Sequence, residues 1–226
     1  MNKFYSVAID GPSGAGKSTI AKLCAENLGF IYVDTGAIYR TVALAAQKAG
    51  LDSKDATGVS GILPKLQISL GHDARGLQQM YLDKQDVSRE IRLPEISVFA
   101  SDVSAMPDVR AYLLGMQRSL AKTSNVIMDG RDIGTVVLPD ADLKIFLTAN
   151  PEERAKRRYA ELLERGVKTT LADVLRDIEY RDTNDSNRKS APLRAAEDAV
   201  IIDTTGNTLT ESFEYICHLI KEKMSK

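Results

Sequence analysis

Residues 11–19 read Gly-Pro-Ser-Gly-Ala-Gly-Lys-Ser-Thr, and this stretch decides the fold. An apolar run over residues 4–9 precedes it, and a helical pattern over residues 20–28 follows it and ends at Gly29. The spacing matches G-x-x-x-x-G-K-[ST], in which glycines let the backbone wrap around a phosphate with its N–H groups pointing inward. We therefore predict a phosphate loop between a buried strand and a helix.

Each polar residue of the phosphate loop has an expected role. Lys17 would reach the β- and γ-phosphates of a nucleotide, and the Ser18 hydroxyl would hold Mg²⁺. The N-terminus of the following helix would add unpaired N–H donors and the positive end of its dipole. The residues assigned to this site are Gly11, Pro12, Ser13, Gly14, Ala15, Gly16, Lys17, Ser18 and Thr19.

Composition narrows the class of protein. The 30 basic and 31 acidic residues give a net charge of −1, which argues against a broad nucleic-acid-binding surface. No stretch approaches the ~20 apolar residues of a membrane span, and the N-terminus lacks a signal-peptide pattern. Cys24 and Cys217 lack metal-ligand spacing and are interpreted as buried thiols in a reducing compartment. We expect a cytoplasmic protein that binds neither membrane nor nucleic acid.

The periodicity predicts an α/β fold. Short apolar strands at residues 31–33, 126–128, 143–147 and 199–203 join the first strand, and helices separate them. Such alternation is typical of a five-stranded parallel sheet in a three-layer domain. The predicted helices cover residues 37–49, 95–105, 108–121, 151–165, 170–186 and 208–223.

Between the predicted helices at residues 37–49 and 95–105, the composition changes near Leu51, where small and polar residues begin. Residues 66–70 and 80–83 are expected to be strands, separated by a glycine-rich turn over residues 71–76. The pattern fits either a small β insertion or an ordinary surface hairpin. On pattern alone, the hairpin is the favoured interpretation.

Charged residues follow the predicted strand ends, where ligands of parallel sheets bind. Asp10, Asp34, Thr35 and Arg40 are expected at the same rim as the phosphate loop. Asp129 follows another strand, where it would organise Mg²⁺ or cap a turn. Further candidates are Arg110, Arg131, Arg181, Asp185 and Arg188. Each arginine alone fits a solvated surface, but together they indicate an anionic ligand.

The helix at residues 151–165 carries Arg154, Arg158 and Arg165 on one stripe, with glutamates between them. Either ion pairs stabilise this helix, or it is a mobile lid that clamps a phosphoryl group. The chain's two histidines, His72 and His218, lie far from the predicted loops. Without an evident base, a phosphate acceptor is favoured, because a phosphate dianion is already nucleophilic.

Five segments together resemble bacterial cytidylate kinase, a nucleoside monophosphate kinase with a phosphate loop. They are residues 11–19, 34–40, 129–132, 139–147 and 181–188. The resemblance covers essentially the whole chain. It implies transfer of the γ-phosphoryl group of ATP to CMP or dCMP with Mg²⁺, by a monomeric enzyme.

The resemblance also implies a domain organisation. A single P-loop kinase domain would have its core at residues 1–61, 93–150 and 187–226. A β insertion in the nucleoside-monophosphate-binding region, residues 62–92, would replace the hairpin. Residues 151–186 would form the helical lid and its flanks.

By matching positions, the resemblance implies a catalytic set and two nucleotide sites. The catalytic set is Lys17, Arg131, Arg154 and Arg158, with Arg157 on the donor nucleotide. The acceptor site is Thr35, Arg40 and Arg131 on the phosphate, with Asp129 and Gly130 beside them; Ser101, Arg110 and Asp132 on the cytosine; and Arg181, Asp185 and Arg188 on sugar and base. Ser18 and Thr35 stand where relatives can have Gly and Ser.

Other functions stay open at this point. A kinase for UMP, GMP or a small metabolite would share the phosphate loop. A switch that hydrolyses ATP or GTP would need a guanine motif such as N-K-x-D, and no clear copy is present.

Overall fold

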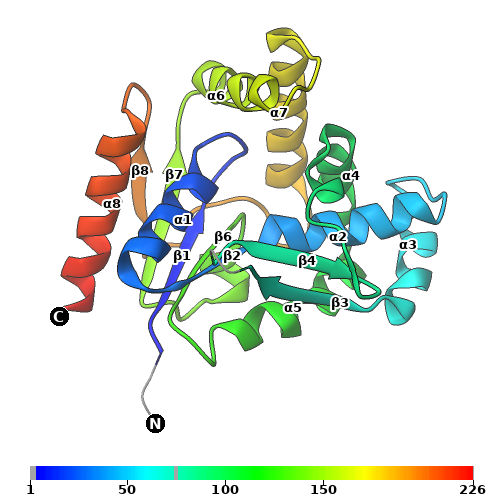
Figure 1. Ribbon diagram of the computed structural model, residues 1–226, viewed down its shortest axis with the longest axis horizontal. Helices are drawn as coiled ribbons and strands as arrows, with labels where there is room; N and C mark the ends of the chain where they lie inside the picture. Colours follow the sequence, from blue (N-terminus) through cyan, green and yellow to red (C-terminus); the bar gives the residue numbers. More distant parts are fainter. Residues whose placement is uncertain (1–3, 74–75, 226) are drawn as a thin grey trace.

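The computed structural model describes residues 4–73 and 76–225, and in this part of the chain five parallel strands form one sheet. Their order is β2-β6-β1-β7-β8, so the strand that leads into the phosphate loop lies in the centre (Figure 1). The strands are β1 (Ser6–Asp10), β2 (Ile31–Asp34), β6 (Val126–Gly130), β7 (Leu143–Thr148) and β8 (Val200–Asp203). The predicted α/β fold with a five-stranded parallel sheet is confirmed.

Helices cover both faces of this sheet. On one face, α1 (Lys17–Leu28) and α8 (Leu209–Met224) pack Ile20 and Ile216 against Ile145 of β7. On the other face, α5 (Pro107–Leu120) packs over Ala8 and Met128. Cys24 and Cys217 are buried free thiols in the α1–α8 layer, as predicted. Within the described residues, no helix combines the length and apolarity that a membrane crossing requires.

A second core surrounds α2 (Thr35–Lys48), which begins two residues earlier than predicted. Its first N–H groups are capped by Asp34, whose carboxylate accepts a hydrogen bond from the Ala37 N–H at 2.9 Å. Ile38 and Val42 of α2 are fully buried against α4 (Pro94–Ser104). The cap therefore fixes both the start of α2 and the direction in which it leaves the sheet.

The segment after α2 folds as an insertion rather than as a surface hairpin. Its strands β3 (Ile68–His72), β4 (Gln78–Leu82) and β5 (Gln85–Asp86) form an antiparallel sheet. Ile68, Met80 and Leu82 are buried in the α2 core, so the pattern-only interpretation was wrong. Residues 74–75 of the predicted turn lie outside the described residues. The short helices of this region are α3 (Ala56–Ile62), η1 (Leu63–Lys65) and η2 (Glu90–Arg92).

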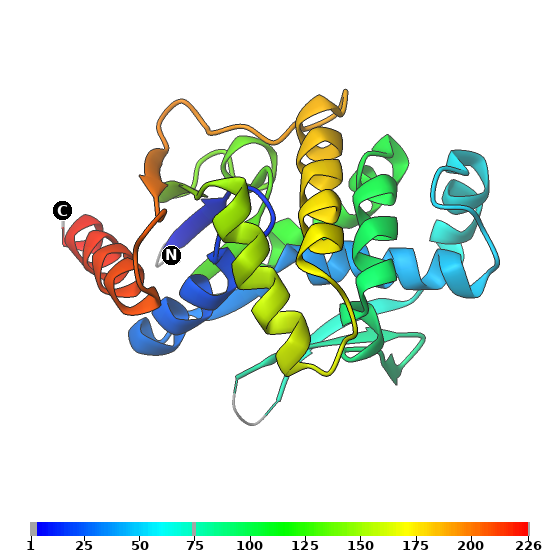
Figure 2. The same cartoon turned by 90° about the horizontal axis from the view of Figure 1, so that it is seen from above.

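Two helices, α6 (Pro151–Glu164) and α7 (Leu171–Asn187), form the segment predicted as a lid. They pack on each other through Ala155, Leu162, Val174 and Ile178. Figure 2 shows α7 standing beside α4, while α6 passes over α1. The lid helices thus lie above the carboxyl edge of the sheet.

Candidate active site

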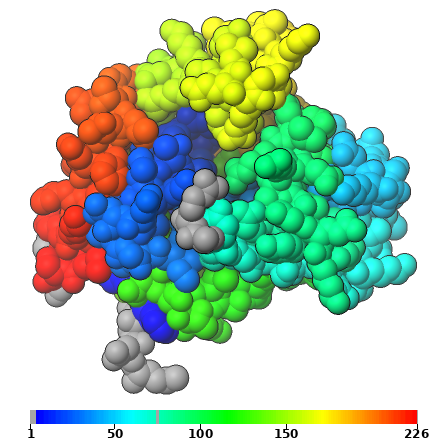
Figure 3. All heavy atoms as spheres, viewed as in Figure 1, coloured from blue at the N-terminus to red at the C-terminus, as the bar shows by residue number. Residues whose placement is uncertain are grey.

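A cavity of about 1370 Å³ opens at the carboxyl edge of the sheet, between the phosphate loop, the β3–β5 sheet and α6 (Figure 3). Sites for one small molecule usually enclose ~300–1000 Å³, so this cavity has room for two nucleotides. The predicted residues that line it are Ser13, Gly14, Gly16, Lys17, Ser18, Thr19, Thr35, Arg40, Ser101, Asp129, Gly130, Arg131, Asp132, Arg157, Arg158, Arg181, Asp185 and Arg188. Gly11, Pro12, Ala15, Arg110 and Arg154 lie behind this lining.

The phosphate loop is shaped by close packing against the sheet. Gly11 has φ +148°, and a Cβ there would lie 1.9 Å from the Leu147 carbonyl oxygen, so only glycine fits. Lys17 reaches back across the loop, and its ammonium donates to the Pro12 carbonyl at 2.7 Å. Burial and, to a smaller extent, the charge of Arg131 lower the pKa of Lys17 to about 7. A phosphate beside Lys17 would favour its charged form.

Oxygen ligands converge next to Lys17. The Ser18 hydroxyl donates to Asp129 Oδ2 at 2.7 Å, and the Tyr32 hydroxyl donates to Asp129 Oδ1 at 3.0 Å. Burial and, to a smaller extent, the charge of Asp34 raise the pKa of Asp129 to about 6. Hydroxyl and carboxylate oxygens suit Mg²⁺, which is usually held by one or two protein groups, water and phosphates. No cluster of three or more His, Cys, Asp or Glu ligands occurs among the described residues.

The junction of β2 and α2 carries the first predicted phosphate contacts. Arg40 forms a 2.7 Å ion pair with Asp34, and its Nε is buried without a hydrogen-bond partner in the part of the chain that is described. The Thr35 hydroxyl donates to the Asp129 carbonyl at 2.7 Å, so its lone pairs, not its proton, face other groups. A Cβ on Gly130 would lie 2.7 Å from that hydroxyl, which explains the glycine.

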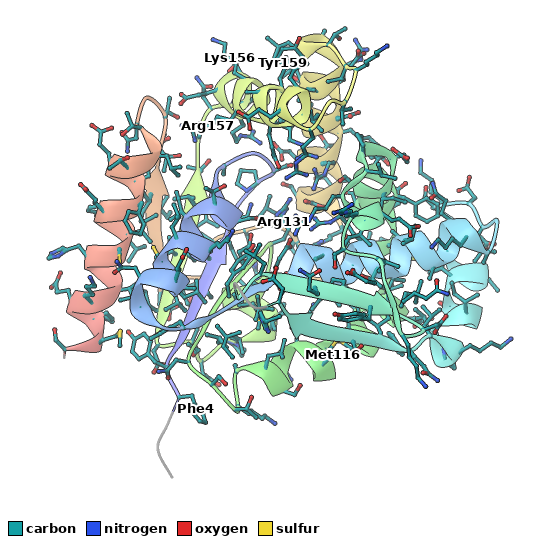
Figure 4. The ribbon with its side chains drawn as sticks, viewed as in Figure 1. Phe4, Met116, Arg131, Lys156, Arg157 and Tyr159 are labelled. Atoms are coloured by element: carbon teal, nitrogen blue, oxygen red, sulfur yellow. The ribbon has the colours of Figure 1, made fainter. Side chains whose placement is uncertain are left out.

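Arginines crowd the centre of the cavity. Arg131 pairs with Asp185 at 2.7 Å, and Figure 4 shows its side chain in the space between the phosphate loop and α7. The Nε of Arg181 is buried and has no hydrogen-bond partner among the described residues. Burial and, to a smaller extent, the charge of Arg131 lower the pKa of Arg181 to about 10. An anion placed here would relieve this repulsion and use the unpaired donors.

The far end of the cavity is a buried network of charges. The carboxylate of Asp132 pairs with Arg110 through one oxygen and with Arg188 through the other, at 3.3 Å for Arg188. The Arg110 guanidinium also stacks over Tyr39, 5.5 Å from the ring centre. Burial raises the pKa of Asp132, although both arginines oppose the shift. Because each charged group has a partner, the side chains at this end of the cavity are held in position before a ligand binds.

Ser101 connects the charge network to α7. Its hydroxyl donates to Asp185 at 3.2 Å and accepts from the Asn184 amide at 2.9 Å. Asp185 therefore contacts Arg131 with one oxygen and Ser101 with the other. Burial would raise the pKa of Asp185, but the charges of Arg131, Arg181 and Arg188 hold it below its usual range.

Arg154 is not in the cavity. It is 4% exposed, donates to the carbonyls of Ala149 and Ser13 at 2.8 Å, and pairs with Asp182 at 2.7 Å. These contacts support the phosphate loop from behind. The expectation that Arg154 contacts the migrating phosphoryl group stays a prediction, and in this structure these oxygens hold its Nε and both terminal nitrogens.

The other lid arginines do face the cavity. Arg157 donates to the hydroxyl and carbonyl of Thr204, at 3.1 and 2.8 Å, beside the loop that follows β8. Arg158 pairs with Glu161 at 2.8 Å, and Arg165 pairs with the same carboxylate. Figure 4 shows Lys156 on the outer side of α6 and Arg157 on its lower side. The ion pairs along the helix are thus present, and a mobile lid that clamps a phosphoryl group stays a prediction.

Sequence reasoning missed three polar residues of the site and the role of a fourth. Tyr32, Gln78 and Asn184 were not singled out, because each acts through a partner that is remote in sequence. Asp10 was expected at the rim, but its function was not foreseen. Its carboxylate accepts from the N–H groups of Ile133 and Gly134 at 2.8 and 2.7 Å and so fixes η3 (Ile133–Val137) behind Asp132.

This combination of a phosphate loop, a parallel sheet and a cavity at its carboxyl edge defines a nucleotide-binding P-loop protein. A family model described as cytidylate kinase matches residues 7–222. The chain belongs to the cytidylate kinase family.

Individual relatives agree with this assignment. A cytidylate kinase of Caldicellulosiruptor saccharolyticus is 49% identical over 217 residues, which cover 96% of this chain and 96% of that protein. One from Pelotomaculum thermopropionicum is 50% identical over 203 residues, 90% of each chain. A solved structure of an uncharacterized protein from Eubacterium ventriosum matches with a TM-score of 0.53 at 13% identity, over 98% of this chain and 99% of that one. The last likeness concerns the fold alone.

Proposed function

We propose that this protein transfers the γ-phosphoryl group of ATP to CMP or dCMP, giving ADP and CDP or dCDP. One observation carries the proposal beyond family membership. The same cavity has a phosphate loop at one end and the buried Asp132–Arg110–Arg188 network at the other, with arginines between them. That order matches a donor triphosphate, a transferring phosphoryl group and an acceptor base.

At the donor end, Lys17 and the loop N–H groups would hold the β- and γ-phosphates. Ser18 and Asp129 would hold Mg²⁺, which neutralises charge on the phosphate oxygens when it is bound. Arg157 lies where the donor nucleotide would extend toward the loop after β8. Arg158 can reach the phosphates if its exposed pair with Glu161 opens.

In the transfer step, an acceptor phosphate oxygen forms a bond to the γ-phosphorus while the bond between that phosphorus and the β–γ bridging oxygen breaks. ADP leaves with the bridging oxygen. Arg131 and Arg158 would supply positive charge to the migrating group, where an arginine accelerates phosphoryl transfer, while Arg40 would hold the acceptor phosphate. No general base is required, because the acceptor phosphate is largely a dianion at neutral pH.

Base recognition follows from donor and acceptor chemistry. Cytosine N4 is a donor, which suits the carboxylate of Asp132 and the oxygen of Ser101. Cytosine N3 and O2 are acceptors, which suit the guanidinium groups of Arg110 and Arg188. Uracil presents an acceptor at O4 and a donor at N3, so buried charges would be left unpaired and UMP would be disfavoured.

The test is ADP release from Mg-ATP with CMP, dCMP, UMP and AMP supplied separately. We expect fast release with CMP and dCMP, slower release with UMP and negligible release with AMP. Equal slow release in every tube, with or without acceptor, would contradict the proposal and indicate a nucleotide hydrolase. A monomeric state and a cytoplasmic location stay predictions from the sequence.

A further inference from the structure

Gln78, on strand β4 of the insertion, holds the main chain of Asp34 on both sides. Its side-chain carbonyl accepts from the Asp34 N–H at 2.7 Å, and its amide donates to the Asp34 carbonyl at 3.1 Å. Gln78 is buried and lines the cavity, 44 positions away from Asp34 in the sequence. One side chain therefore makes the pair of hydrogen bonds that a neighbouring strand would make.

This contact falls on the free edge of the main sheet. Strand β2 is an outer strand, with β6 on its one paired side. His72, which pairs with Gln78 across the β3–β4 ladder, lies with Nε2 3.4 Å from the Tyr32 carbonyl. The end of the β3–β4 hairpin thus meets the carboxyl end of β2, through side chains of adjacent paired residues.

Asp34 connects the hydrogen bonds from Gln78 to the proposed acceptor site. One carboxylate oxygen caps α2 at the Ala37 N–H, and the other holds Arg40 at 2.7 Å. Burial would raise the pKa of Asp34, but the charges of Arg40 and Arg92 and the Ala37 hydrogen bond lower it, so the carboxylate stays ionised. The orientation of the Arg40 guanidinium therefore depends on where the Asp34 backbone is fixed.

We propose that Gln78 is a positioning residue of the acceptor-phosphate site: it fixes the β2–α2 junction so that Asp34 presents Arg40 to the acceptor. The proposal rests on the proposed function and adds a role for the insertion within it. Gln78 acts through Asp34 and Arg40 rather than by touching the transferred group.

The test is the kinetics of Gln78→Leu, which keeps the apolar stem and removes both hydrogen bonds. We expect KM for CMP to rise about tenfold, the size of a weakened hydrogen bond to a charged group, with KM for ATP unchanged and kcat changed less. Gln85→Leu is the matched control, because Gln85 is an exposed glutamine of the same antiparallel sheet. An unchanged KM for CMP in Gln78→Leu would overturn the proposal.

A double-mutant cycle separates positioning from general support of the fold. Arg40→Met removes the guanidinium through which Gln78 is proposed to act. In that background, Gln78→Leu is expected to leave KM for CMP unchanged. A further tenfold rise would mean that Gln78 acts by another route and would overturn the proposal.

If Gln78→Leu does not fold, Gln78→Glu takes its place in both experiments. Glutamate can still accept from the Asp34 N–H, but it faces the Asp34 carbonyl without a donor. The same rise in KM, and the same loss of the effect in Arg40→Met, are expected. The wild-type assay with CMP is run first: its failure concerns the proposed function, whereas a normal wild type with unaffected variants refutes the role of Gln78 alone.

Discussion

Ser18 and Asp129 share a hydrogen bond of 2.7 Å across 111 positions of sequence. It joins the first turn of α1 to the end of β6, the two places that were expected separately to serve Mg²⁺. Tyr32 holds the second oxygen of Asp129, so the carboxylate is oriented from both sides. Ser18, the predicted Mg²⁺ ligand, and Asp129, the predicted acid, are therefore direct hydrogen-bond partners.

Replacing Asp129 with Asn tests this pair. The amide keeps the shape of the side chain but is a poorer ligand for Mg²⁺, so kcat is expected to fall about 10- to 100-fold and the Mg²⁺ requirement to rise. The measurement is initial rate against Mg²⁺ concentration. Asp198→Asn is the control, because that exposed carboxylate pairs with Lys144 away from the cavity. The same Mg²⁺ dependence as wild type would remove Asp129 from the metal site.

Arg131→Ala removes the arginine at the centre of the cavity. We expect kcat to fall about 10³-fold, because an arginine that stabilises the migrating phosphoryl group is worth at least this much. The fold is expected to persist, since Asp185 keeps Ser101 and lies near Arg188. The measurements are kcat and the thermal midpoint of unfolding. The control is Arg176→Ala, on an exposed part of α7. Near-normal turnover would exclude Arg131 from the transfer.

Asp132→Asn probes base selection. It removes the charge that is proposed to face the cytosine amino group, and its amide can turn a donor toward uracil O4. The preference for CMP over UMP, measured as the ratio of kcat/KM, is expected to narrow about tenfold or more, with KM for ATP unchanged. A ratio equal to that of wild type would show that Asp132 does not contact the base.

Replacing Arg154 is expected to lower stability, whereas replacing Arg158 is expected to lower turnover. Arg154→Met leaves Asp182 and two carbonyls without their donor, so the free energy of unfolding is expected to fall by about 3 kcal/mol. Arg158→Met breaks a partly exposed pair worth less than ~1 kcal/mol, so it is expected to lower kcat with little effect on stability. Urea denaturation and steady-state rates of both variants check this. Equal stability of the two would contradict the buried role of Arg154.

Asp10 predicts a pH dependence of stability. Burial raises its pKa to about 7, although hydrogen bonds from Gly134 and Ile133 oppose the shift. An unfolded Asp has a pKa of ~3.9, so between these values the folded state binds the extra proton. The free energy of unfolding therefore loses a contribution from Asp10 as pH rises from about 4 to 7, and the loss is complete above the folded pKa.

Asp10→Asn removes this titration. The slope of unfolding free energy against pH is expected to become less negative by up to ~1.4 kcal/mol per pH unit in that window. Urea denaturation at pH 5, 6 and 7 measures both slopes. Parallel slopes for the two proteins would refute the raised pKa.

The sequence predicted the sheet well because buried parallel strands are short and mainly apolar, as residues 126–128 and 143–147 are, and turn residues and helical patterns separate them. It missed α3 because residues 52–60 are small and polar, although Asp55 caps this helix locally at the Gly58 N–H and Val59 is buried in the core. The insertion was misread from pattern alone because the apolar face of a hairpin does not reveal what it packs against. The resemblance, not the periodicity, indicated the insertion.

The candidate site shows the same limit. The spacing of Arg154 and Arg158 placed both on one helical stripe, yet one supports the phosphate loop and the other faces the cavity. The spacing shows which residues share one face of a helix, but it does not show how deeply each turn of that helix is buried. Gln78 could not be found from sequence at all, because its partner is main chain, which every residue carries.

The side-chain cover over β2 also bears on solubility. An open strand edge invites pairing with another chain and hence aggregation. At β2, Gln78 and His72 occupy that edge with polar groups instead of a further strand. At the opposite margin, β8 is four residues long, like β2, and ends at Asp203. Both edge strands of the main sheet are thus short and end in an aspartate, and β2 is in addition covered by polar side chains of the β3–β4 hairpin.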